Sequence, residues 1–461
     1  MKIRSRALPA KLLLSAWAAT VVTGACSRTD DPFERYGAAA LPSGGATAAG
    51  GGGAGSQAGT GGASPSAGRD TAGDAGEGPL GGGAGPEPFD PNYGCGDPPI
   101  ASTKTFTKGA LRSAAADCAE WQYCRFEGAA SNLELEVASY ADDPTEQTLT
   151  AARASLGRAA SLWSELELFQ FGPLASSSVA SGKDTEQGEG LRELIHSWPL
   201  TVRCRVEEQI VTRNYLNGMD AVLISARGLF GLDYLLNFDG TDTACTPSSV
   251  AGKKWAQTSP EQLAELKLDY AAALGSDVLA SIRKVRSRWA ADEGNFRPLF
   301  VDGTGYRDEK QVMTILAWSL LYVEREVKDW KVGVPAGYTA TSPVTLPELP
   351  YSGLSTEAIR GNLRGFKRLF EGCGDDGEGL GFDDWLASTG VPDLASDLVA
   401  AHRSAEALLA DFPPLHAATP AELEALYRAI KGVTDLLKND LFGSGSPLGL
   451  TLPDGIASDT D

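Results

Sequence analysis

The segment Ser225–Gly240, SARGLFGLDYLLNFDG, constrains the fold of this chain more than any other stretch. Leu229, Leu232 and Leu236 recur at i, i+3 and i+7, which is the spacing of one apolar stripe along a helix. Asp233 is four residues after Leu229 and three before Leu236, so it lies on the same stripe. A carboxylate on an apolar face is costly unless it has a partner. The pattern therefore predicts a buried helix whose acidic side chain is paired.

The same segment carries a family resemblance. Gly228 and Gly231 flank Phe230 and allow another backbone or a ligand to approach closely. The stretch Gly228–Leu236 resembles the motif of the imelysin family of bacterial envelope proteins, Gly-x-His-x-x-Glu followed by an aromatic residue and two leucines. Phe230 stands at the histidine position and Asp233 at the glutamate position. The family's His and Glu face the same way on a helix and could share a metal, whereas phenylalanine cannot ligate one.

Five further segments resemble the family and follow its order. They are Glu167–Pro173, Trp198-Pro199, Lys328–Gly337, Glu348–Ser355 and Leu448–Leu452. The resemblance covers the chain from about Thr103 onward and implies an all-α fold of two helical bundles with a cleft between them, here residues 100–255 and 256–455. Helical periodicity alone indicates a mostly helical chain in two halves. Its long helices are expected near 111–137, 145–170, 260–291, 308–328, 356–371, 393–411 and 420–442.

The N-terminus has the layout of a secretory signal. Basic residues precede the apolar run Leu12–Val22, and the small residues Thr23-Gly24-Ala25 precede Cys26. This predicts a signal peptide over 1–26 with a lipoprotein-type cleavage site; a plain signal peptide is the alternative. Lipidated Cys26 would anchor an exported protein to the outer membrane, and membrane contact is expected through this lipid alone.

Residues 27–90 are a low-complexity, Gly/Ala-rich segment with runs such as Gly50–Gly53. Such a composition cannot bury a core and predicts a disordered tether. The formal net charge of the chain is -20, which argues against nucleic acid as a partner because phosphate binding needs clustered Lys and Arg.

Six cysteines remain beyond Cys26, and an even number in an exported protein predicts disulfides. Cys204 and Cys245 bracket the opening segment, so a bridge between them would join its ends. Cys118 and Cys124 would not face each other on a helix, and we expect them not to pair.

Two carboxylates are retained in the family frame. Glu167 and Asp233 could bind a divalent or iron cation through oxygen if the bundles bring them together, helped by Glu348, backbone oxygens or water. The alternative is that Asp233 pairs with Arg227 or another cation and serves packing.

A second set of residues is predicted to bind a cofactor or small ligand. Arg227 could hold an anion by its forked guanidinium or could cap a carbonyl. Ser352 and Ser355 could contact a ligand or cap a helix. Trp198 and Gly228 complete this set, with Trp198 in either a cleft or the core.

Histidines are few. His196 lies just before Trp198-Pro199 and could approach the motif helix, although a structural or surface role is the commoner one. His402 and His416 are expected at the surface. No His-Glu-x-x-His occurs, which excludes a zincin-type peptidase.

The resemblance implies iron or haem acquisition at the bacterial envelope, and some family members were assigned as metallopeptidases. With Phe230 at the histidine position, we expect no peptidase activity. The expected role is a non-catalytic binding or accessory component of iron, haem or other metal acquisition. A metal or small ligand and other envelope uptake proteins are its expected partners. The alternatives are a metal-dependent peptidase with an altered site and a surface interaction module.

Overall fold

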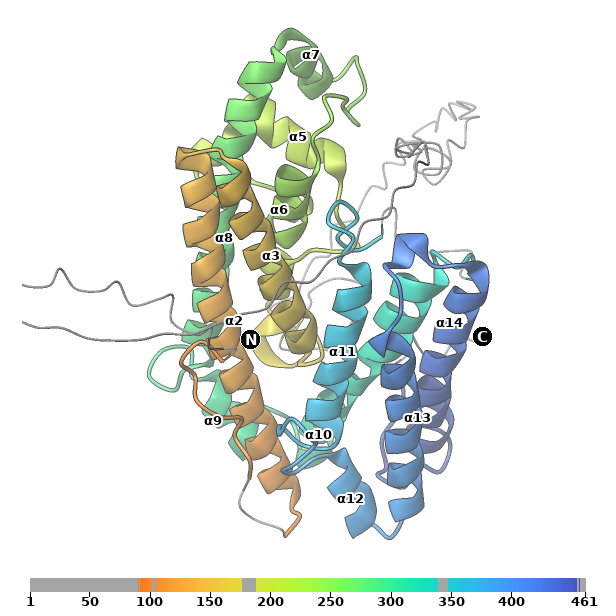
Figure 1. Cartoon of the computed structure of the whole chain (residues 1–461). Coiled ribbons are helices and arrows are strands. Elements are labelled where there is room, and N and C mark those ends of the chain that lie inside the picture. Colours follow the sequence, from red (N-terminus) through yellow and green to blue (C-terminus); the bar gives the residue numbers. More distant parts are fainter. Residues whose placement is uncertain are drawn as a thin grey trace, which may run out of the picture. The chain divides into compact units, whose positions relative to one another are not determined.

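Helices are the only regular elements in the part of the chain that the computed structural model describes, which is residues 90, 92–101, 105–175, 188–338, 347–453 and 456. The all-α expectation is therefore confirmed (Figure 1). Across these ranges, no helix combines the length and the apolar character needed to cross a bilayer. The signal peptide, Cys26 and the tether up to residue 89 lie outside the described residues.

The helices fall into two groups along the chain. The first group contains α2 (Lys108–Asp142), α3 (Glu146–Leu166), α4 (Arg192–Ile195), α5 (Arg203–Thr212), α6 (Gly228–Asn237), α7 (Val250–Gln257), α8 (Pro260–Trp289) and α9 (Phe296–Asp302). The second contains α10 (Glu309–Trp318), the π-helix η7 (Val323–Gly333), α11 (Ser355–Phe370), α12 (Phe382–Ser388), α13 (Pro392–Ala410), α14 (Pro420–Asp435) and the π-helix η9 (Leu436–Leu441).

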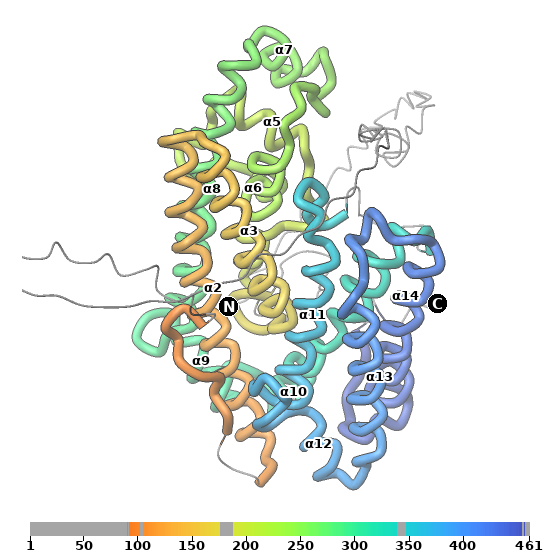
Figure 2. The backbone as a smooth tube through the Cα atoms, viewed as in Figure 1, coloured from red at the N-terminus to blue at the C-terminus, as the bar shows by residue number. Residues whose placement is uncertain are grey.

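The long helix α2 is the spine of the first group. It packs along both α3 and α8, and α8 also contacts α6. Helix α3 packs on its other side against α11, so this pair joins the two groups (Figures 1 and 2). Helices α13 and α14 then pack side by side in the second group (Figure 2). The division predicted from the sequence puts α8 at the start of the second bundle, whereas in the structure α8 packs beside α2 of the first group. The boundary between residues 255 and 256 stays a prediction.

Local sequence signals explain where several helices begin. Ser259 caps α8 through a capping box with Gln262, and Pro260 occupies the first turn. Thr145 and Thr419 form the same kind of box at α3 and α14. In contrast, the helix expected over 308–328 is divided, because α10 stops at Trp318 and the chain continues through a 3-10 turn into η7.

Three disulfides cross-link the part of the chain that the structure describes. They join Cys95 to Cys124, Cys118 to Cys373 and Cys204 to Cys245. The Cys204–Cys245 bridge, which the sequence raised while leaving the pairing open, is present, and the expectation that Cys118 and Cys124 do not pair is confirmed.

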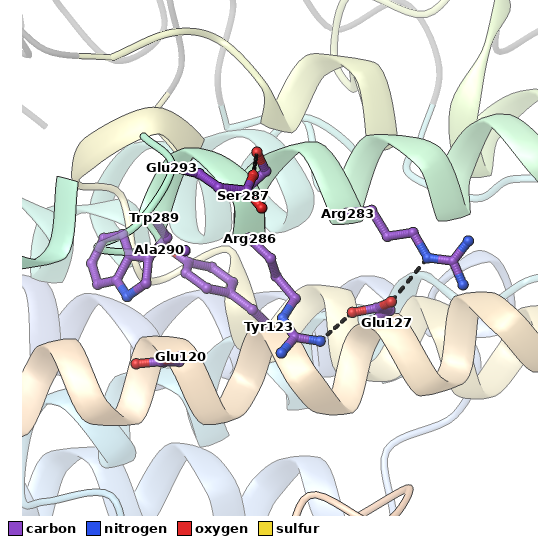
Figure 3. A pocket seen from close by; sticks show the side chains of 9 residues that line it. All are labelled: Glu120, Tyr123, Glu127, Arg283, Arg286, Ser287, Trp289, Ala290 and Glu293. Atoms are coloured by element: carbon purple, nitrogen blue, oxygen red, sulfur yellow. Dashed lines mark hydrogen bonds and ion pairs between the residues drawn. The ribbon is translucent and has the colours of Figure 1, made fainter. Parts of the chain in front are cut away.

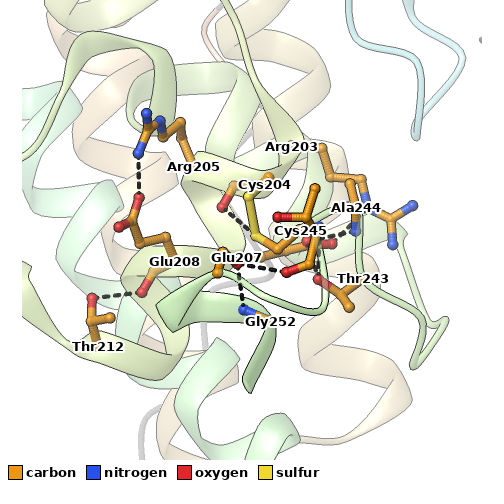
Figure 4. The surroundings of a disulfide bond; sticks show 12 residues. Arg203, Cys204, Arg205, Glu207, Glu208, Thr212, Thr243, Ala244, Cys245 and Gly252 are labelled. Carbon is orange, nitrogen blue, oxygen red and sulfur yellow. Dashed lines mark hydrogen bonds and ion pairs between the residues drawn. A yellow bond between two sulfur atoms is a disulfide. The ribbon is translucent and has the colours of Figure 1, made fainter. Parts of the chain in front are cut away.

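Glu207 reinforces the Cys204–Cys245 bridge (Figure 4). Its buried carboxylate accepts hydrogen bonds from Thr243 Oγ1 at 2.7 Å and from the amide of Ala244 at 2.8 Å. Tyr234 of α6 donates to the same carboxylate at 3.1 Å. The disulfide and Glu207 together attach the 241–245 segment to α5 and to the motif helix.

One expectation about histidine is wrong. His402 is fully buried on α13, and its Nε2 lies 2.9 Å from the carbonyl oxygen of Leu363 on α11. The packing of α13 against α11 buries it, which its own segment does not reveal. His416 is exposed, as expected.

Candidate functional site

Four chain segments bring ionisable side chains together where the two helical groups meet. Glu167 caps the end of α3, His196 follows α4, Lys331 lies in η7, and Glu348 precedes α11. All four are buried. One ligand atom each of Glu167, His196 and Glu348 lies within 4.8 Å of the other two. We call these four residues the ionic centre.

Glu167 has a partner for each lone-pair direction of its carboxylate. Its Oε1 accepts from Trp163 Nε1 at 3.0 Å and from Arg192 Nη2 at 3.2 Å. Its Oε2 accepts from Lys331 Nζ at 2.9 Å and from Asn362 Nδ2 at 3.1 Å. Burial alone would raise the pKa of Glu167, but the cations of Lys331 and Arg192 lower it to about 2. Glu167 is therefore held ionised by donors of the protein itself.

Lys331 supplies the cation of the centre. An ammonium group has three N–H donors, and those of Lys331 face Glu167 Oε2 at 2.9 Å, Glu348 Oε2 at 2.8 Å and Asn362 Oδ1 at 2.7 Å. Burial disfavours the charged form, yet the two carboxylates raise the pKa of Lys331 above its ordinary value. The ring of Trp198 lies 5.7 Å from the ammonium, which is a cation–π contact.

His196 joins the centre through Glu348. Its Nε2 lies 3.0 Å from Glu348 Oε1, and its Nδ1 has no hydrogen-bond partner among the described residues. His196 is 1% exposed, which agrees with the structural role that the sequence favoured. That role is within the ionic centre. In the sequence, the feature that pointed to His196 was its position just before Trp198-Pro199. The peptide bond of this pair is cis.

Asp233 lies on the buried face of α6, as its position in the apolar stripe predicts. Its Oδ2 accepts from the amide of Tyr351 at 3.0 Å and its Oδ1 from the amide of Ser352 at 2.9 Å. Burial raises the pKa of Asp233 to about 6, and these hydrogen bonds offset only part of that effect. Asp233 thus fixes the segment that carries Glu348.

The alternative pairing of Asp233 with Arg227 is wrong. Arg227 binds Asp277 instead, with Nε 2.8 Å from Oδ2 and Nη2 against Oδ1, and its Nη1 donates to the carbonyl of Met219 at 3.1 Å. Arg227 precedes the first turn of α6 and its side chain points to α8, which carries Asp277. The joint binding of a metal by Asp233 and Glu167 stays a prediction.

The remaining residues of the predicted ligand set make contacts within the protein. Gly228 has φ +71°, and a Cβ there would lie 2.1 Å from the carbonyl oxygen of Ile195, so the close approach is to backbone. Ser355 Oγ donates to the carbonyl of Glu348 at 2.5 Å. Phe230, at the motif's histidine position, is fully buried and packs on the ring of Tyr351 with centroids 6.2 Å apart.

The ionic centre contains the kinds of side chain that bind metal ions. One imidazole and two carboxylates suit zinc or ferrous iron by ligand type. However, the Lys331 ammonium already lies between both carboxylates, and with Arg192 it balances their charge. A divalent cation would add two uncompensated charges in a buried place. As built, these residues do not fit a metal.

The fold and the ionic centre define a class: an all-α protein whose two helical groups meet at a buried, internally neutralised cluster of carboxylates and cations. This chain belongs to the imelysin family. The family model described as Imelysin, named Peptidase M75, matches residues 121–439.

Two solved structures share the fold. An imelysin-like protein from Psychrobacter arcticum 273-4 superposes with a TM-score of 0.55 at 18% identity, over 75% of this chain and 98% of that one. A protein from Parabacteroides distasonis ATCC 8503, provisionally named iron-regulated protein A precursor, gives 0.53 at 15% identity, over 74% and 96%. No curated protein matches this chain. At these identities the likeness shows the fold.

Proposed function

We propose that this protein is a non-catalytic imelysin that serves as an exported binding or accessory component in the acquisition of iron or another metal. The observation that carries the non-catalytic part of the proposal is the position of Lys331. Its ammonium occupies the space between Glu167 and Glu348 that a catalytic metal would need. Family membership and the provisional name of the Parabacteroides relative support the link to iron.

The chemistry of the ionic centre supports the proposed absence of catalysis. A hydrolytic metal site keeps one coordination position for water and exposes it to substrate. Here Glu167 and Glu348 are at most 2% exposed, and Glu167 has four hydrogen-bond donors. Phe230 places an apolar ring where the family motif has its histidine.

The place of action belongs to the same proposal. We expect export through the signal over 1–26, anchoring to the outer membrane through Cys26, and a body carried away from the membrane by the tether. A metal or small ligand and other envelope uptake proteins are the proposed partners.

The test has a biochemical arm and a growth arm. Purified mature protein, dialysed and then supplied in turn with zinc, iron and calcium, should leave casein intact and should retain no stoichiometric metal at the ionic centre. A strain that lacks the gene should grow more slowly than its parent under iron limitation, and the wild-type gene should restore growth.

The two arms separate the alternatives. Casein digestion that a chelator blocks, and that Asp233→Ala abolishes, would establish the altered metallopeptidase. Unimpaired growth of the deletion strain under limitation for iron and for other metals would point to the interaction module instead.

A further inference from the structure

A pocket of about 390 Å³ lies between α10 and the segment that carries Thr451. Its volume is within the roughly 300–1,000 Å³ of typical small-molecule sites. None of its lining residues belongs to the ionic centre. Its wall includes Arg307, Asp308 and Lys310 at the start of α10, Ile315 and Trp318 towards the end of this helix, and Thr451.

A smaller pocket, of about 270 Å³, lies between α2 and α8 and is less suited to a ligand (Figure 3). Its charged side chains bind one another. Glu127 accepts from Arg283 at 2.9 Å and also binds Arg286, and Ser287 donates to Glu293, as the dashed lines mark. The charges of that pocket are therefore largely neutralised within the protein.

One end of the pocket at α10 is apolar and preformed. Ile315 is 4% exposed, and the half-buried indole of Trp318 lies one turn further along the same helix. Trp318 Nε1 donates to the carbonyl oxygen of Thr451 at 2.8 Å, which fixes the orientation of the ring and attaches the Thr451 segment to α10. A ligand can thus bury an apolar group here without rearranging the wall.

The other end carries two accessible cations. Arg307 immediately precedes the cap of α10, and its side chain is 76% exposed. Lys310, in the first turn, is also exposed. Because a helix rises 1.5 Å per residue, the backbones of Lys310 and Trp318 lie about 12 Å apart along α10. The cationic end and the apolar end are therefore within reach of one small molecule.

The neighbouring carboxylates leave Lys310 without a partner. Asp308 caps α10, where its Oδ1 accepts from the amide of Gln311 at 2.8 Å, and its Oδ2 lies 3.5 Å from Arg307 Nε. Glu309 pairs with Lys108 of α2 at 3.2 Å. No carboxylate of the described residues forms an ion pair with Lys310.

Local charges, more than the net charge of the chain, decide what this end attracts. The net charge of -20 repels anions at long range. At physiological ionic strength, however, exposed charges are largely screened beyond about 8 Å. Arg307 shares its charge with Asp308, so Lys310 supplies about one unpaired positive charge. One charge matches a carboxylate better than a phosphate group, which carries about -1.5 to -2.

We propose that this pocket binds a small amphipathic carboxylate, in which one carboxylate group and an aromatic or aliphatic group are joined within about 12 Å. The carboxylate pairs with Lys310 and accepts hydrogen bonds from the guanidinium of Arg307. The apolar group lies on Ile315 and the ring of Trp318.

Titration of the purified protein with 4-phenylbutyrate tests the proposal. The readout is the indole N–H signal of Trp318 in two-dimensional nitrogen–proton spectra, which Trp318→Phe assigns. We expect saturable movement of this signal with a millimolar dissociation constant. The neutral 4-phenylbutanamide should bind about fivefold more weakly, the equivalent of one exposed ion pair of about 1 kcal/mol. Lys310→Met should weaken binding of 4-phenylbutyrate by the same factor.

Lys253→Met is the matched control. Lys253 of α7 is exposed, has no carboxylate partner among the described residues and does not line the pocket. This variant should bind 4-phenylbutyrate as wild type does.

Three results would overturn the proposal. In the first, 4-phenylbutyrate leaves the Trp318 signal unmoved, or the amide binds as tightly. In the second, Lys310→Met and Lys253→Met, both with wild-type circular dichroism, bind equally well. In the third, inorganic phosphate binds more tightly than 4-phenylbutyrate, which would indicate a simple anion site. None of these results depends on whether the protein takes part in metal acquisition.

Discussion

Replacing Lys331 by methionine is the most direct perturbation of the ionic centre. Methionine has similar length but no charge, so it removes the ion pairs with Glu167 and Glu348 and the hydrogen bond to Asn362. The two carboxylates are affected unequally. Glu167 keeps Arg192, Trp163 and Asn362, whereas Glu348 keeps His196.

Loss of one partner from a buried ion pair destabilises a protein by about 3–5 kcal/mol, because the remaining charge is left without compensation. We expect a value in this range for Lys331→Met, measured by urea unfolding at neutral pH. Lys108→Met is the matched control, because Lys108 pairs with Glu309 at 3.2 Å with its side chain 40% exposed. An exposed pair contributes about 1 kcal/mol or less.

The same variant exposes the metal-binding potential of the centre. With the ammonium gone, Glu167, His196 and Glu348 remain as a set of possible ligands, and the cation left beside them is Arg192, which pairs with Glu167. Zinc or ferrous iron at a hundredfold excess over its dissociation constant should restore about 2.7 kcal/mol to the variant and nothing to wild type. If Lys331→Met costs no more than Lys108→Met, or if wild type gains as much from metal, Lys331 is not the cation of this centre.

Three further results are expected. The stabilisation by ionised Glu167 is present above its ordinary pKa of 4.5 and is lost as the pH falls towards 2. The stabilisation by Asp233 is present below pH 3.8 and is lost as the pH rises through about 6. Together they predict a maximum of thermal stability between about pH 4 and 5, and a melting temperature that rises steadily to neutrality would contradict this. Asp233→Ala removes the acceptor of the part-buried amides of Tyr351 and Ser352, which should cost about 1–3 kcal/mol in urea unfolding and speed hydrogen exchange at that segment. Unchanged exchange there would refute the anchoring role. Loss of the bridge between Cys204 and Cys245, which are 41 residues apart, should lower the free energy of unfolding by about 4 kcal/mol through loop entropy. Urea unfolding of the variant with both cysteines replaced by serine measures this loss. Equal stability of the wild type with and without reductant would argue against this value.

Features that depend on near neighbours in the chain could be predicted from the sequence. The apolar stripe defines the motif helix, and the capping residues define the start of α8, because a helix is set by residues three and four apart. The placement of Asp233 on a buried face follows from the same periodicity. Helix α3, however, ends at Leu166 and not at residue 170. The next residue, Glu167, binds side chains from α4, η7 and α11.

Tertiary packing alone decided the partners of these residues. Lys331 lies 164 positions from Glu167 and reads as an ordinary helical lysine, and no local signal predicts its burial between two carboxylates. Likewise, Arg227 pairs with Asp277, 50 positions away, although Asp233 is six positions away. The sequence by itself determined the helices, the family and the loss of the motif histidine. Which cation neutralises which carboxylate depends on distances between segments, and these exist only once the helices have packed.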